Sequence, residues 1–173
     1  LKGGQKIGKI KVSDKTFILS WTTTPWTLPG HVGLAVGEKM KYALVENKET
    51  KERYILASEL ADNVLSIDEY ETVTEVKGKA LLGLRYEPLF GVAELENKKS
   101  HRVYGADFVT ITEGTGVVHT AVMYGVDDYE LGVKVGLPQV HTVDETGRFK
   151  SIVKGFKGLR VKDLETEKKI LVY

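Results

Sequence analysis

One stretch of the sequence, Trp21 to Pro29, constrains the fold around it more than any other. It reads WTTTPWTLP, and its two prolines remove backbone donors and break a regular helix. β-Branched and aromatic residues at 16–20 and apolar residues at 32–36 flank it, which is typical of short strands. We therefore expect a non-helical segment in which three threonines follow a strand, with hydroxyls and amides available to a ligand.

A second stretch, EGTGVVHTA at 113–121, combines two glycines with a predicted buried strand that carries His119. Asp127 and Asp128 follow it and open a predicted helix, with Asp127 as the N-cap of a capping box. Gly136 is expected to end this helix. A carboxylate at a helix start is expected to stay ionised and to suit an ammonium ligand. A site built from these residues requires the two stretches to meet in space.

Periodicity in the rest of the chain predicts many short strands and few helices. The strands are expected at 9–13, 16–22, 32–36, 41–46, 53–57, 71–76, 101–112, 117–121 and 140–143, and the helices at 58–67, 127–136 and 162–171. This pattern predicts an α+β, mainly β fold, centred on a β-barrel with peripheral helices. A length of 173 residues predicts one domain spanning 1–173. The chain begins at Leu1 rather than Met, so we expect it to be a piece of a longer protein.

Composition excludes several kinds of chemistry. The chain has no cysteine, which removes disulfides, thiolate nucleophiles and cysteine-ligated zinc, and which fits a reducing, cytoplasmic location. Its four histidines show no metal-ligand spacing, so no metal is expected. No G-x-S-x-G motif and no apolar run of about 18 residues is present. We therefore expect a site that binds and orients, with water as the nucleophile and no membrane partner.

From the residues alone, simpler interpretations remain open. The threonine run can be a strand edge and turn, and the two aspartates can be helix caps. His119 can be a half-buried histidine with its hydrogen bonds satisfied, and Gly116 can be a backbone device. The basic run that contains Lys98, Lys99 and Arg102 is either a solvated loop or a surface that contacts phosphates.

Two motifs together resemble those of one protein family. WTTTPWTLP at 21–29 and GTGVVHTAVMYGVDDY at 114–129 are similar to the two signatures of the editing (CP1) domain of isoleucyl-tRNA synthetases. Their order and separation match as well, and the resemblance covers nearly the whole chain. Thr24 stands where the related valyl and leucyl enzymes have arginine, and AVMY at 121–124 resembles the archaeal and eukaryotic cytosolic type. The chain departs from the family at Gly30 and His31, where the family often has alanine and asparagine.

The resemblance implies a β-barrel-centred editing domain of the valyl/leucyl/isoleucyl type, a fragment of a larger class I synthetase. It implies hydrolysis of the ester of valyl-tRNA(Ile), with the tRNA 3′ end and the rest of the parent chain as partners. Carried over by position, Asp128 would anchor the α-amino group, and His119 would limit the size of the side-chain pocket. The ester, water and terminal adenosine would be held by Thr22, Thr23 and Thr24, with Trp21 as a wall and His31 and Gly116 beside the substrate.

The resemblance also implies that this domain needs no cofactor, since ATP and magnesium would belong to the absent synthetic part of the parent. An alternative of a different class stays open. The chain can be a catalytically silent module that keeps the fold and binds the tRNA acceptor end. Intact Thr24, His119 and Asp128 favour hydrolysis, whereas His31 favours the silent module.

Overall fold

The structure is a computed structural model that describes all 173 residues of the chain. The residues group into two compact units. Unit 1 comprises residues 1–21, 34–87 and 101–118, and unit 2 comprises residues 22–33, 88–100 and 119–173. Both units are therefore assembled from segments that lie far apart in the sequence.

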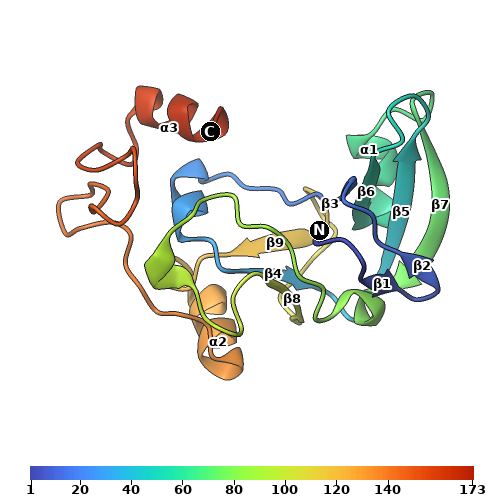
Figure 1. Cartoon of the computed structure of the whole chain (residues 1–173), viewed down its shortest axis with the longest axis horizontal. Helices are drawn as coiled ribbons and strands as arrows, with labels where there is room; N and C mark the ends of the chain where they lie inside the picture. Colours follow the sequence, from blue (N-terminus) through green and yellow to red (C-terminus); the bar gives the residue numbers. More distant parts are fainter. The chain divides into compact units, whose positions relative to one another are not determined.

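Unit 1 contains a four-stranded sheet and a short β-hairpin (Figure 1). The sheet has the order β3 (Thr16–Ile18), β6 (Arg53–Ala57), β5 (Lys41–Asn47) and β7 (Tyr70–Lys77). Its pairs are antiparallel except β3 with β6, which is parallel. The hairpin pairs β1 (Lys6–Ile7) with β2 (Ile10–Lys11). The alternation at 41–46, 53–57 and 71–76 predicted three of these strands correctly.

A three-stranded sheet has the order β8 (Arg102–Gly105), β4 (Gly33–Val36) and β9 (Val117–Thr120). The strand expected at 32–36 is confirmed as β4, and it is buried along its whole length. The α+β, mainly β class is confirmed. The strands of the predicted barrel form separate ladders of two, four and three strands rather than one closed ring.

The helical segments are short. Unit 1 has η2 (Ser58–Leu60), α1 (Ala61–Val64) and η3 (Gly78–Leu81). Unit 2 has η1 (Pro25–Gly30), η4 (Ala93–Leu95), α2 (Val126–Val135) and α3 (Leu164–Leu171). Helices predicted at 127–136 and 162–171 are confirmed. None of these helices is long and apolar enough to cross a membrane.

Predictions of secondary structure were wrong for four segments. Pro25 and Pro29 were expected to exclude a helix, but residues 25–30 form a 3₁₀ turn. Pro25 is tolerated at the first position, where its missing N–H has no helical partner, whereas Pro29 lies inside the turn. Residues 140–143 form no strand, only an isolated bridge from Val143 to Phe149. The predicted helix at 58–67 and the predicted strand at 101–112 contain shorter elements than expected. For 101–112 the reason is that alternation alone does not supply a pairing partner.

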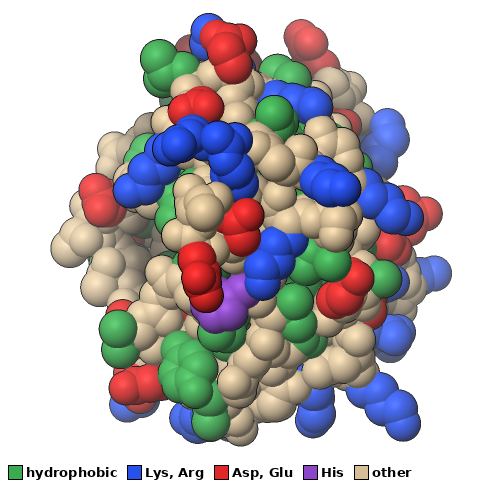
Figure 2. Space-filling view, turned by 90° about the vertical axis from the view of Figure 1, so that its left-hand side faces the viewer, with side chains coloured by type: hydrophobic (Ala, Val, Ile, Leu, Met, Phe, Trp, Pro, Cys, Tyr) green, Lys and Arg blue, Asp and Glu red, His purple; other side chains and the backbone are tan.

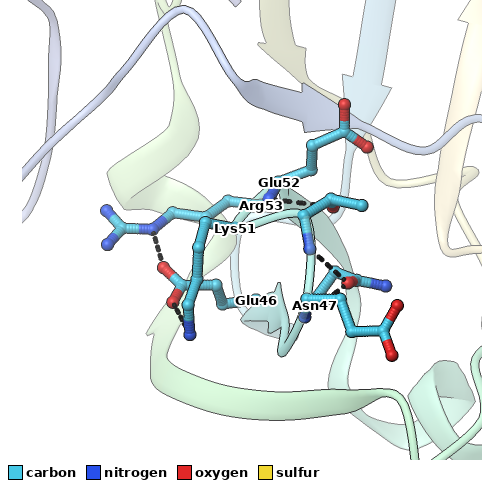
Figure 3. A network of polar contacts seen from close by, with 7 residues as sticks. Glu46, Asn47, Lys51, Glu52 and Arg53 are labelled. Carbon is cyan, nitrogen blue, oxygen red and sulfur yellow. Dashed lines mark hydrogen bonds and ion pairs between the residues drawn. The ribbon is translucent and has the colours of Figure 1, made fainter.

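The hairpin turn between β5 and β6 fixes the register of these strands (Figure 3). The Oδ1 atom of Asn47 accepts hydrogen bonds from two backbone N–H groups of the turn, both at 2.9 Å. Lys51 adopts a left-handed φ of 59°, and its N–H donates to the Asn47 carbonyl. The Glu46 carboxylate bonds Arg53 Nε at 2.8 Å and lies 3.4 Å from Lys51 Nζ, so the turn is closed by side chains as well.

The core of unit 1 is organised around Tyr42, which is fully buried. Its hydroxyl accepts the Gly37 N–H at 2.9 Å and donates to the Gly116 carbonyl at 2.7 Å. The bond to Gly116 holds the glycine stretch that leads into β9. Both buried backbone groups therefore have a hydrogen-bond partner. A buried backbone group without a partner would lower the stability of the fold.

We predict that Tyr42→Phe lowers the free energy of unfolding by about 1–3 kcal/mol, because it leaves a buried N–H and a buried carbonyl without their partner. The measurement is urea unfolding followed by circular dichroism. Tyr129→Phe is the matched control, since Tyr129 is 45% exposed on α2 and should lose almost nothing. Equal stability of the two variants would contradict the assignment.

Candidate functional site

Thr22, Thr23 and Thr24 lead into η1, and the threonine run is folded on itself. The Thr24 N–H donates to Thr22 Oγ1 at 3.1 Å. The carbonyl of Thr24 accepts both the N–H of Thr27 at 3.0 Å and its hydroxyl at 2.8 Å. Thr23 and Thr24 are exposed, whereas Thr27 is buried. Thr27 is therefore buried within the 3₁₀ turn, whereas Thr23 and Thr24 before it are exposed to solvent.

The structure brings the two sequence stretches together within unit 2. His119 Nε2 lies 3.0 Å from Thr22 Oγ1 and 3.4 Å from Thr27 Oγ1. The His31 ring, which is buried at the end of η1, lies 5.8 Å from the His119 ring between centroids. Of these residues, Thr27 was missed by the sequence analysis. Its spacing of three from Thr24 was the signal that a 3₁₀ turn would place both on one side.

The contact with Thr27 favours the tautomer of His119 that carries its proton on Nε2. The Thr27 hydroxyl donates to the Thr24 carbonyl, so it can only accept from the imidazole. We therefore assign the proton to Nε2, which leaves Nδ1 buried without a hydrogen-bond partner. Protonating Nδ1 would bury an unsatisfied cationic donor. Consistent with this, burial lowers the pKa of His119 to about 4.

Asp128 lies in the first turn of α2, beside the end of β9. Its Oδ2 accepts the N–H of Ala121 at 3.2 Å, two residues after His119. Burial raises the pKa of Asp128, whereas the bond from Ala121 lowers it and the nearby Asp127 raises it. The expectation that the helix start keeps this carboxylate ionised was thus incomplete, because desolvation is the larger influence.

The predicted capping box was wrong. Helix α2 begins at Val126 after Gly125, and no side chain caps it. Asp127 is exposed in the first turn rather than at the N-cap. The C-terminal prediction is confirmed, because Gly136 adopts a left-handed φ of 81° there.

Two predicted site residues, Trp21 and Gly116, belong to unit 1. Trp21 is 49% exposed, and its side chain covers Gly114, where an added Cβ would lie 2.6 Å from the indole. Gly116 has φ of 67°, and a Cβ would lie 2.4 Å from that of Ala57. Gly116 is therefore needed for backbone conformation and close approach, as the simpler interpretation held.

The basic side chains of the run 98–102 differ in their exposure to solvent. Lys98 and Lys99 are exposed in a turn whose N–H groups are bound by the Asn97 side chain. Arg102 is half-buried at the start of β8, and its Nε is buried without a hydrogen-bond partner. The chain contains no group of three or more His, Asp or Glu side chains arranged to hold a metal ion.

A cavity of about 850 Å³ in unit 2 was also missed by the sequence analysis. Trp26, Tyr124 and His141 contribute rings to its wall, and Lys150 and Lys162 contribute cations. These residues come from four separated segments with no shared motif, so the sequence held no signal for them.

We predict that the free energy of unfolding falls as the pH drops from about 6.5 to about 4. A histidine titrates at 6.5 in the unfolded chain but at about 4 in the folded one, so the unfolded state binds the extra proton in this window. The loss contributed by His119 amounts to at most about 3 kcal/mol. Urea unfolding across this range should show the loss, and NMR should show a neutral His119 at pH of about 5.

His119→Gln should have a weaker pH dependence, whereas His141→Gln, which changes an exposed histidine, should behave as the wild type. A His119 that titrates near 6.5 would refute the assignment.

The chain is similar to parts of curated isoleucine–tRNA ligases. It is 44% identical to the enzyme of Clostridium tetani and 46% identical to that of Clostridium novyi, each over 165 residues. A second isoleucine–tRNA ligase of Bacillus thuringiensis is 43% identical over 159 residues. These matches cover 92–95% of this chain but only 15% of each relative. No protein-family model matches the chain. The predicted archaeal or eukaryotic cytosolic type stays a prediction.

Solved structures with a similar fold are leucyl-tRNA synthetase editing domains. The cytosolic domain of P. falciparum gives a TM-score of 0.59 at 16% identity, covering 90% of this chain and 64% of that one. The cytosolic domain of P. knowlesi gives 0.52 at 17% identity, covering 65% and 48%. The chain is thus a homologue of one segment of the isoleucine–tRNA ligases and has the fold of the synthetase editing domains.

Proposed function

We propose that residues 1–173 are a single editing domain of a larger class I synthetase, and that it hydrolyses the ester bond of valyl-tRNA(Ile). The observation that carries this proposal is the hydrogen bond between His119 and Thr22, with Asp128 bound to the same end of β9. Threonine hydroxyls, a neutral imidazole and a partly buried carboxylate thereby lie in one unit.

The need for such an activity follows from the size of the amino acids. Valine is one methylene smaller than isoleucine, and a pocket discriminates against it by only about 1–3 kcal/mol; isoleucine against valine is the established example of this limit. A second site that admits valine and excludes isoleucine removes the error. Homology to isoleucine–tRNA ligases supports this substrate pair for the chain.

We assign Asp128 to the α-amino group of the esterified valine. Its carboxylate is partly desolvated, so a bound ammonium is attracted more strongly than at an exposed carboxylate. His119 would close the side-chain pocket, its ring held through Nε2 by Thr22. Thr23 and Thr24, which are exposed, would hold the ester, the water and the terminal ribose.

Water is the nucleophile in this proposal. A histidine whose pKa is about 4 is a weak general base, and its Nε2 is already engaged with threonine hydroxyls. A hydroxyl of the terminal ribose would orient or activate the water instead. The domain would then act by positioning, which supplies much of the rate in such reactions.

The proposed partners are the valine-carrying 3′ end of tRNA(Ile) and the remainder of the parent chain. Lys98, Lys99 and Arg102 are proposed to contact acceptor-stem phosphates, supported by the exposure of the two lysines. ATP and magnesium would act in the absent synthetic part, and the location would be cytoplasmic. Trp21, Gly116 and His31 remain proposed substrate neighbours.

A silent tRNA-binding module is the second candidate. The buried ring of His31, 5.8 Å from that of His119, occupies space beside the threonine cluster and favours this reading. Release of labelled valine from valyl-tRNA(Ile) separates the two, because a silent module would bind the tRNA without releasing valine.

We predict that Asp128→Asn lowers the deacylation rate at least about ten-fold. Asparagine keeps an oxygen for the Ala121 N–H but removes the charge, and a hydrogen bond to a charged group contributes about 1.5–3 kcal/mol. Asp127→Asn is the matched control, because Asp127 is exposed on the same turn and should retain the wild-type rate. A wild-type rate for Asp128→Asn would remove Asp128 from the proposed role.

We further predict that His119→Ala gains activity on isoleucyl-tRNA(Ile), even where its rate on valyl-tRNA(Ile) falls. Valine and isoleucine share charge, ester and adenosine, so only a steric wall separates them, and shortening His119 opens it. The measurement is the ratio of the two deacylation rates in wild type and variant. If the variant loses both activities and still spares isoleucine, His119 orients the reaction and the wall lies elsewhere.

A further inference from the structure

The start of β5 and the end of β7 lie side by side in unit 1 and carry a group of lysines (Figure 1). Lys41 and Lys77 are directly opposite each other in the ladder between the two strands, so their side chains share one face of the sheet. Two further lysines lie in the backbone next to these strand ends. All four side chains are exposed, and together they form the four-lysine surface: Lys39, Lys41, Lys77 and Lys79.

Backbone hydrogen bonds hold the two lysine segments together. The Gly78 N–H donates to the Met40 carbonyl at 2.9 Å, and the Lys79 N–H donates to the Glu38 carbonyl at 3.0 Å. Gly78 is buried, and an added Cβ there would collide with the Gly37 carbonyl oxygen. The close approach of the two backbones fixes the positions from which the lysines extend. Their charges are therefore gathered before any partner binds.

No carboxylate forms an ion pair with these four ammonium groups. Like charges directly opposite each other in a ladder lower its stability, and the Lys41–Lys77 pair is such a case. The two acidic residues nearest in the sequence do not compensate for it. The Glu38 carboxylate lies against Gly105, and Glu75 is exposed on β7 without an ion pair.

The same ladder contains one other pair of like charges, and that pair is compensated. Glu46 of β5 lies opposite Glu71 of β7, and Glu46 forms ion pairs with Arg53 at 2.8 Å and with Lys51 at 3.4 Å. The face drawn in Figure 2 likewise shows basic side chains interspersed with acidic ones. The four-lysine surface differs because its positive charge has no counter-charge within the chain. Such a departure from the usual pattern is typical of a surface that meets a charged partner.

We propose that the four-lysine surface binds the phosphate backbone of RNA. Lysine ammonium groups bind phosphates as point charges, and such contacts need no apolar surface. A protein partner matches less well, because lysine is depleted at protein–protein interfaces, where aromatic residues are enriched. No aromatic residue lies among the four lysines at 37–41 and 77–79. The RNA would be the tRNA of the proposed function, so this inference rests on that function and adds a docking surface in unit 1 to it.

The experiment is fluorescence anisotropy of the whole chain with end-labelled, uncharged tRNA(Ile), measured between about 50 and about 200 mM salt. The double variant Lys41→Gln/Lys77→Gln should bind about ten-fold more weakly at the lower salt concentration. Its plot of log K against log salt should become shallower by about 1–2, because two phosphate contacts are lost. Circular dichroism should show that the variant is folded, since it removes a repulsion rather than a contact.

Lys15→Gln/Lys51→Gln is the matched control. It removes two exposed lysines from the opposite end of the same sheet, next to the Thr16–Arg53 pair, where Lys51 is already paired with Glu46. This variant should bind tRNA with the affinity and the salt dependence of the wild type.

The proposal is overturned if the wild type binds no tRNA at about 50 mM salt, or if Lys41→Gln/Lys77→Gln keeps the wild-type affinity and salt dependence. An equal loss in the control variant also overturns it, because the effect would then be one of net charge. Vesicles containing phosphatidylserine and polyglutamate are tested in parallel. Binding of either that depends on Lys41 and Lys77, with unchanged tRNA binding, would replace RNA by a membrane or an acidic protein.

The same measurement is independent of hydrolysis, because uncharged tRNA carries no ester. Loss of affinity in Lys41→Gln/Lys77→Gln, with no release of valine from valyl-tRNA(Ile) by the wild type, would refute the proposed hydrolysis and support the docking surface. Release of valine by the wild type, with unchanged tRNA affinity in the variant, would refute the docking surface alone.

Discussion

The hydrogen bond between His119 and Thr22 is the interaction on which the candidate site depends. It joins residues 97 positions apart in the sequence and brings the end of β9 to the threonine run. Thr27 adds a second oxygen from within the 3₁₀ turn. Because the Thr27 hydroxyl donates to the Thr24 carbonyl, this contact also favours the imidazole tautomer with its proton on Nε2.

Burial shifts the pKa values of His119 and Asp128 in opposite directions. Desolvation disfavours the charged form of each, so it lowers the pKa of His119 and raises that of Asp128. His119 is therefore a neutral, shape-giving ring. Asp128 keeps a compensating bond from the Ala121 N–H, which makes it the more suitable partner for an ammonium group.

The segment η1 links the site to the cavity next to it. Thr27 contacts His119, and Thr24 contacts Thr27. Trp26 and Gly30 contact the Tyr124 ring instead. Proline at the first position of the turn and the close approach of Gly30 to Tyr124 fix its course. The same turn therefore borders both the His119 cluster and the cavity.

The sequence by itself determined the central strands, the end of α2 at Gly136 and the identity of the two motifs, because alternation, glycine conformation and motif spacing are local properties. It did not predict the 3₁₀ turn at the prolines, the Ala121 N–H as the partner of Asp128, or the cavity around Tyr124. Only the tertiary structure decided these, because each depends on which distant groups lie in contact and on how far burial removes them from water.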